Sequence, residues 1–203
     1  MSGDEMAEQV RIWAGVTGFL SAASLLALVL FFALARPWGD VQAGWFWLGP
    51  TNDWLSVLGA VPWIVATILL ARHARLGGAW WVLTGAVVAG IAAMAIVTLV
   101  MLAGRTTLEV QTITALPAVL LAFVWTAIAT SAAVRQGALP GWVAGLAVAL
   151  VVALVVGALL IGVAFLVPEG PSRVVLWVVG GVPGGLAWLG YPAAWLCIAA
   201  RVS

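Results

Sequence analysis

Six long stretches of this sequence consist almost entirely of apolar residues, and only short segments separate them. A helix that crosses a bilayer needs about 20 mostly apolar residues, and each stretch comes close to that length or exceeds it. We therefore expect an all-α integral membrane protein, a six-transmembrane-helix bundle with short loops that forms a single domain over residues 1–203. The predicted spans are 12–35, 54–71, 79–103, 113–134, 141–167 and 174–200.

The composition agrees with a membrane location and excludes several classes of protein. Of all residues, 65% are hydrophobic and 7% are charged, whereas a soluble domain carries about 25% charged residues. Soluble enzymes and disulfide-rich secreted proteins are therefore excluded, and a net charge of +1 offers no basic patch for nucleic acid. One Cys and one His fall short of the ligands of a zinc site. We expect no metal and no cofactor, with membrane lipid around the helices.

The arginines predict an orientation. An even number of spans puts both termini on one side, and the flanks and loops of that side carry more arginine than those of the other side. The arginines on the side of the termini are Arg11, Arg72, Arg75, Arg135 and Arg201, and the others are Arg36, Arg105 and Arg173. Loops rich in basic residues stay in the cytoplasm. A sequence whose basic residues are all arginine, with no lysine, is typical of bacteria with GC-rich genomes. We expect a multi-pass protein of the bacterial plasma (inner) membrane with cytoplasmic termini.

Small residues recur every four positions in several spans. The clearest stripe is Gly145, Ala149, Ala153 and Gly157, with similar runs at Gly85, Ala89 and Ala93 and at Ala118, Ala122, Thr126 and Thr130. Such stripes let two helices approach closely. We interpret them as packing faces within the bundle. The alternative is a docking face for a second copy of the chain or for a partner subunit.

Proline and centrally placed tryptophan occur only in the second, fourth and sixth spans. They are Pro62, Pro117, Pro183 and Pro192, with Trp63, Trp125 and Trp188. Proline kinks a helix, and the carbonyls it frees need protein or a water-lined cavity around them. We therefore predict that these three helices are kinked and line a central cavity, while the others buttress it. The glycine-rich segment 180–185 is a candidate for either a broken helix or a simple kink.

The segment between the first two spans is unusually aromatic. Trp38, Trp45, Trp47 and Trp54 have the amphipathic rings that anchor helix ends among lipid headgroups. The segment either belongs to such an aromatic belt or partly covers the outer mouth of the cavity.

Polar residues cluster where the even-numbered spans begin. Thr51, Asn52 and Asp53 are good helix N-caps, the pair Thr106 and Glu109 fits a capping box, and Ser172 can cap the last span. Capping is our first interpretation. Asp53 and Glu109 also have a functional interpretation, because a carboxyl at the apolar boundary is partly desolvated and can act as an acid or bind a cation beside aromatic rings.

These considerations define a candidate site that faces the outer side. The candidate ligand-binding residues are Asn52, Trp45, Trp47, Trp54, Trp63, Gln111, Trp125, Trp188 and Tyr191. Asp53 and Glu109 are the catalytic candidates if the protein is an enzyme.

Three functions remain open. The first is binding or transport of a lipophilic or aromatic small molecule. The size and six-span layout are similar to those of the substrate-binding subunits of energy-coupling vitamin transporters. The second is an acid-initiated cyclisation of an isoprenoid, since the abundant Trp resembles small membrane-bound terpene cyclases in a general way. The third is an accessory role in a larger membrane complex.

Overall fold

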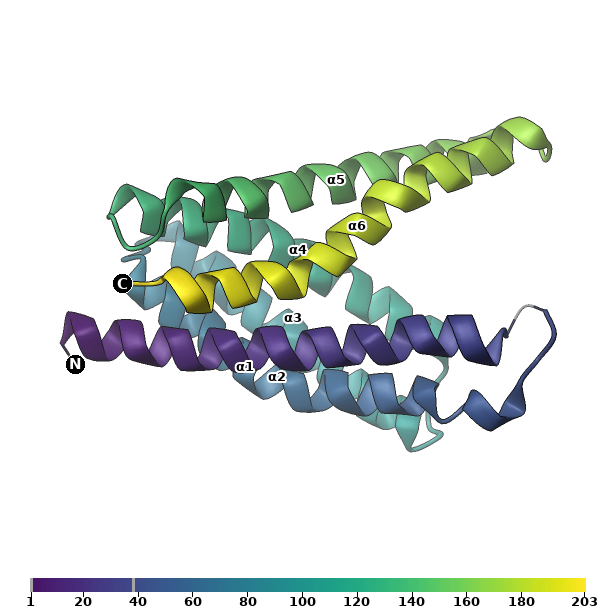
Figure 1. The fold of residues 1–203 in the computed structure, drawn as a ribbon, viewed down its shortest axis with the longest axis horizontal. Helices are drawn as coiled ribbons and strands as arrows, with labels where there is room; N and C mark the ends of the chain where they lie inside the picture. Colours follow the sequence, from purple (N-terminus) through teal and green to yellow (C-terminus); the bar gives the residue numbers. More distant parts are fainter. Residues whose placement is uncertain (1, 38) are drawn as a thin grey trace.

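The computed structural model describes residues 2–37 and 39–203, and its six long helices form one bundle (Figure 1). The helices are α1 (Gly3–Leu30), α2 (Leu48–His73), α3 (Ala79–Leu102), α4 (Leu108–Arg135), α5 (Gly141–Leu166) and α6 (Pro171–Arg201). The described residues contain no strand, and each of the six helices is long and apolar enough to cross a membrane. The chain is therefore a multi-pass, six-helix membrane protein, and the predicted fold class is confirmed.

The helices form a closed ring in which neighbours along the chain pack on each other. α1 packs on α2, the series continues to α5 on α6, and α6 returns to pack on α1. Both termini lie at one end of the bundle (Figure 1). We call this end the terminal end and the opposite end the distal end. The connections from α1 to α2, from α3 to α4 and from α5 to α6 therefore lie at the distal end.

The start of α2 differs from the prediction and changes the surroundings of the first polar cluster. The helix begins at Leu48, so Asn52 and Asp53 lie inside it, and Trp47 occupies the N-cap position without a side-chain cap. Pro50 therefore lies in the first turn of α2 and not in the preceding loop. Proline fits this position because the backbone N–H groups of a first helical turn have no partner within the helix. The interpretation of this cluster as an N-cap was therefore wrong.

Two other predicted caps also differ. Thr107, not Thr106, caps α4, because its backbone is extended and its hydroxyl accepts the N–H of Val110 at 3.4 Å. Glu109 lies in the first turn of α4 and is exposed. α6 begins with Pro171 after Gly170, which places Ser172 inside the first turn.

Prolines lie inside all three even-numbered helices. α6 nevertheless continues without a break from Pro171 to Arg201, through the glycine-rich segment 180–185. It bends in its middle (Figure 1), as expected of a helix that contains Pro183 and Pro192. Of the two interpretations of the glycine-rich segment, the structure therefore supports a bend.

A close backbone approach between α5 and α6 involves only the last member of the predicted stripe on α5. A Cβ atom at Gly157 would lie 2.8 Å from the carbonyl oxygen of Gly180 and 2.8 Å from the nitrogen of Gly184. Gly145 and Ala149, in contrast, are exposed. The helices touch through backbone at Gly157, and any side chain there forces them apart.

The matching stripes on α3 and α4 also differ from each other. All four members of the α4 stripe, Ala118, Ala122, Thr126 and Thr130, are buried. On α3, Gly85 and Ala89 are exposed, and the close approach to α4 occurs at Gly90, where a Cβ would lie 3.1 Å from Ala118 Cβ. Regular spacing of small residues therefore identified the packing face of α4 but not that of α3.

We predict that Gly157→Ala destabilises the protein by about 1–3 kcal/mol, because the added methyl group overpacks the contact with α6. Gly162→Ala is the matched control, since Gly162 lies on the same helix and its Cβ would have no neighbour within 4 Å. Thermal unfolding in mild detergent compares the two variants. Equal melting temperatures would contradict the close α5–α6 contact.

Candidate ligand pocket

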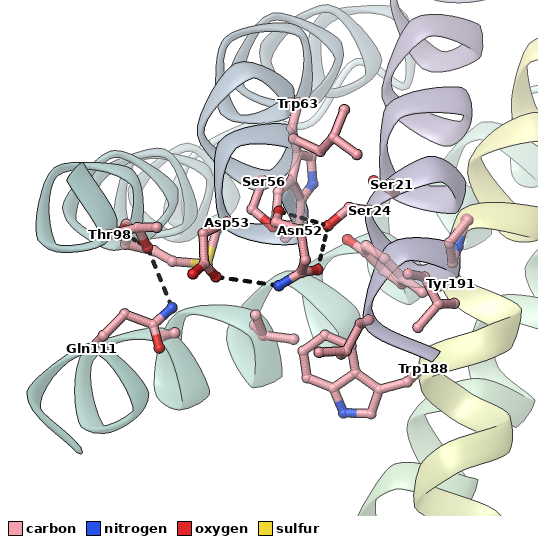
Figure 2. Close-up of a pocket in the computed structure, with 18 residues that line it drawn as sticks. Ser21, Ser24, Asn52, Asp53, Ser56, Trp63, Thr98, Gln111, Trp188 and Tyr191 are labelled. Atoms are coloured by element: carbon pink, nitrogen blue, oxygen red, sulfur yellow. Dashed lines mark hydrogen bonds between the residues drawn. The ribbon is translucent and has the colours of Figure 1, made fainter. Parts of the chain in front are cut away.

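A pocket of about 210 Å³ lies in the distal half of the bundle (Figure 2). Its polar and aromatic lining residues are Ser21, Ser24, Asn52, Asp53, Ser56, Thr98, Gln111, Trp63, Trp188 and Tyr191. The remaining lining is Leu25, Leu28, Leu55, Gly59, Met94, Ala115, Val119 and Pro192. The pocket therefore combines polar groups with aromatic rings inside the membrane-spanning part of the fold.

The wall of the pocket corrects the prediction that only even-numbered helices line the cavity. α1 and α3 contribute alongside α2, α4 and α6, and among the described residues α5 contributes none. Two features of the arrangement explain this. The helices form a ring without an inner and an outer layer, and the distal halves of α5 and α6 run together away from α1 (Figure 1).

A chain of hydrogen bonds joins α1 to α2 at the pocket. Ser24 Oγ donates to Asn52 Oδ1 at 2.8 Å and lies 2.9 Å from Ser56 Oγ. Because a serine has one hydroxyl proton, Ser56 is the donor in the second contact. Asn52 Nδ2 in turn donates to Asp53 Oδ1 at 3.2 Å. These bonds satisfy polar groups that would otherwise be costly to place in an apolar environment.

A second polar contact lies across the pocket between α3 and α4. Gln111 Nε2 donates to Thr98 Oγ1 at 3.3 Å, and the Thr98 hydroxyl donates to the carbonyl of Met94 at 2.8 Å. Figure 2 shows Gln111 and Asp53 on the same side of the pocket, away from Trp188 and Tyr191. The pocket therefore has Asp53 and Gln111 on one side and the rings of Trp188 and Tyr191 on the other, with Asn52 between them.

The charge of Asp53 has no ion-pair partner among the described residues. Its carboxyl group is half-buried, and its hydrogen bond within the described residues comes from Asn52. The ion pairs of the described chain, Arg11–Glu8 and Arg173–Glu169, do not involve it. Among the described residues that line the pocket, Asp53 alone is acidic and none is basic.

The aromatic side belongs to a cluster centred on Tyr191. The Tyr191 ring stacks on Phe123 of α4 with 4.1 Å between centroids and meets Trp63 of α2 edge-on at 5.7 Å. Trp188 lies against Phe123 at 6.3 Å, and Trp195 lies 6.4 Å from Tyr191. We call these five residues the aromatic cluster. It joins α2, α4 and α6, and three of its members, Trp63, Trp188 and Tyr191, line the pocket.

The Tyr191 hydroxyl is buried and has one good hydrogen bond. It lies 3.1 Å from Thr126 Oγ1, which donates its own proton to the carbonyl of Ala122 at 2.7 Å. Tyr191 is therefore the donor to Thr126. The indole N–H groups of Trp63 and Trp195 approach the same hydroxyl, but they do not reach hydrogen-bond geometry with it or with any other described residue.

The structure brings together six of the residues that the sequence singled out. Asn52, Asp53, Trp63, Gln111, Trp188 and Tyr191 all line the pocket. Ser24, Ser56 and Thr98 also line it, although they were not among the candidates. A signal existed in their spacing, because Asn52 and Ser56 on α2, like Met94 and Thr98 on α3, are four residues apart and share a helix face.

The other candidates lie elsewhere. Glu109 is exposed and does not line the pocket. Trp45, Trp47 and Trp54 are exposed at the distal end, as interfacial anchors are, and Trp38 lies outside the described residues. Trp125 is buried and turns toward α3, where its indole N–H donates to Thr84 Oγ1 at 2.9 Å. A hydrogen-bond partner on α3 thus directs Trp125 away from the pocket.

Comparisons with models of protein families, with curated proteins and with solved structures found no match to this chain. The functional argument therefore depends on the chemistry of the pocket itself.

We predict that Tyr191→Ala destabilises the protein by about 3–5 kcal/mol, the cost of removing a large buried aromatic side chain. Tyr191→Phe keeps the ring and removes the hydrogen bond to Thr126, so its cost should be only about 0.5–1.5 kcal/mol. Unfolding in mixed micelles with increasing denaturant measures both values. If Tyr191→Ala were as stable as the wild type, the aromatic cluster would not hold α2, α4 and α6 together.

Proposed function

We propose that this protein binds a small lipophilic molecule with one polar end in the distal pocket. The observation that carries the proposal is the division of the pocket into two sides. Asp53 and Gln111 lie on one side, and the rings of Trp188 and Tyr191 lie on the other. A molecule with a polar end and an apolar or aromatic body matches this division. Ligand pockets commonly combine an apolar lining with a few placed polar groups in this way.

The size of the pocket limits what it can hold. Pockets for drug-sized ligands measure about 300–1,000 Å³, whereas this one measures about 210 Å³. It has room for a small ligand or for one end of a longer one. Cyclisation of an isoprenoid requires much of a long chain to fold inside the site. Binding is therefore the better proposal, although Asp53 shares the pocket with the aromatic faces that a cyclase would use.

A pocket-filling variant tests the proposal. Ala115 lines the pocket, so Ala115→Trp should occupy the space of the ligand. Ala149→Trp is the control, because Ala149 is exposed on α5, which contributes no described residue to the pocket. In native mass spectrometry after mild extraction from its own membrane, the wild type and Ala149→Trp should retain a small molecule that Ala115→Trp has lost. Absence of a bound molecule in the wild type, or equal retention in Ala115→Trp, would contradict the proposal.

We also propose that the protein resides in a bacterial plasma membrane with its termini in the cytoplasm. The support is the excess of arginine in the loops and flanks of the terminal end. The pocket then lies in the outer half of the membrane and takes its ligand from that side.

The orientation predicts the behaviour of fusions. Green fluorescent protein fused after Ser203 should fluoresce, because it folds in the cytoplasm. The same fusion inserted in the connection between α3 and α4 at residue 105 should remain dark after export. The reverse pattern of fluorescence in cells would show that the pocket opens toward the cytoplasm.

A further inference from the structure

We propose that the ligand of the distal pocket is an organic cation whose positive charge lies against Asp53. This inference rests on the proposed function and adds a charge to the ligand. Its apolar or aromatic body then lies on the other side of the pocket, against Trp188 and Tyr191. The supporting features are the position of Asp53, the charges around it and the arrangement of the rings.

Asp53 lies inside a membrane-spanning helix, in the second turn of α2. It lies between Trp47 and Trp54, which are exposed as interfacial anchors are, so its carboxyl group is near the boundary of the apolar layer. A half-buried carboxylate at this boundary is partly desolvated, and a nearby positive charge stabilises it. Two residues of the neighbouring turns, Asn52 and Ser56, face the same pocket. The carboxylate therefore faces a built polar wall and not a solvated loop.

The described residues leave the charge of Asp53 uncompensated. An ionised carboxylate has about four acceptor positions, and the bond from Asn52 Nδ2 at 3.2 Å occupies one. Gln111 gives a proton of its amide to Thr98, and Ser24 gives its only proton to Asn52. No described Arg or His pairs with Asp53 or lines the pocket. A cationic ligand would supply the missing charge.

The aromatic rings suit the rest of such a ligand. Aromatic faces attract cations and also pack against apolar groups. Figure 2 shows Trp188 and Tyr191 across the pocket from Asp53, with Asn52 between them. A molecule that spans the pocket can therefore place its charge at Asp53 and its body on the rings.

A metal ion fits this pocket less well than an organic cation. The described residues contain no group of three His, Cys, Asp or Glu side chains that could hold a metal. Asp53 supplies one carboxylate, whereas the rest of the lining consists of neutral hydroxyl and amide groups together with apolar and aromatic groups. Such a lining is suited to a hydrophobic body attached to the charge.

Two probes of equal shape isolate the effect of charge. Benzyltrimethylammonium is a cation, and 2,2-dimethylpropylbenzene replaces its nitrogen with carbon and is neutral. Equilibrium dialysis of the protein in lipid nanodiscs against empty nanodiscs measures the specific binding of each. We expect the wild type to bind the cation about tenfold more tightly than the neutral probe, as for a partly desolvated charge pair with aromatic faces.

Two variants assign the selectivity to one carboxyl group. Asp53→Asn keeps the size of the side chain and removes its charge, and it should bind both probes with about equal affinity. Glu109→Gln removes one charge from an exposed residue at the same end of the bundle, and it should keep the full preference of the wild type. Size-exclusion chromatography and thermal unfolding establish that both variants are folded.

The outcomes separate the two proposals. Specific binding of both probes with equal affinity in the wild type would overturn the cation assignment and leave a neutral ligand in the same pocket. A preference that survives in Asp53→Asn would place the cation elsewhere and also overturn the assignment. Binding of neither probe, together with a wild type that retains no small molecule after extraction, would overturn the proposed function itself.

Discussion

The packing of Tyr191 between α2 and α4 is the contact on which both the bundle and the pocket depend. Its ring stacks on Phe123 and meets Trp63, and its hydroxyl donates to Thr126. A hydroxyl buried within a membrane-spanning bundle needs a protein partner, because lipid supplies none. The same ring borders the pocket. The shape of the pocket is therefore set by the interaction that joins α2, α4 and α6.

Several other polar side chains within the spans form their hydrogen bonds inside their own helix. The hydroxyls of Thr17, Thr84 and Thr130 each donate to the carbonyl four residues earlier in their own helix, which removes the cost of placing them in an apolar medium. The pocket departs from this pattern. The bond from Ser24 to Asn52 crosses from α1 to α2, and Asn52 in turn donates to the carboxyl group of Asp53, which has no ion-pair partner among the described residues.

The positions of the spans could be predicted from the sequence, because the thickness of a bilayer sets the length of an apolar helix. The start of α2 could not, since Pro50 suits a loop and a first helical turn equally well. Only some of the residues that line the pocket were predicted from the sequence. Trp63 and Trp125 have the same signal in the sequence, but Thr84 binds the indole of Trp125 and turns it toward α3. Which residue of another helix a side chain contacts depends on tertiary packing, and no local sequence pattern predicts it.

The central claim is that the space between Asp53 and Tyr191 is a ligand site and not a packing defect. The most direct measurement is an experimental density map of the protein extracted from its own membrane into nanodiscs without detergent. We expect non-protein density in the pocket, with one end against Asp53 and the other against Trp188 and Tyr191. A map in which side chains close this space and leave no such density would contradict the claim.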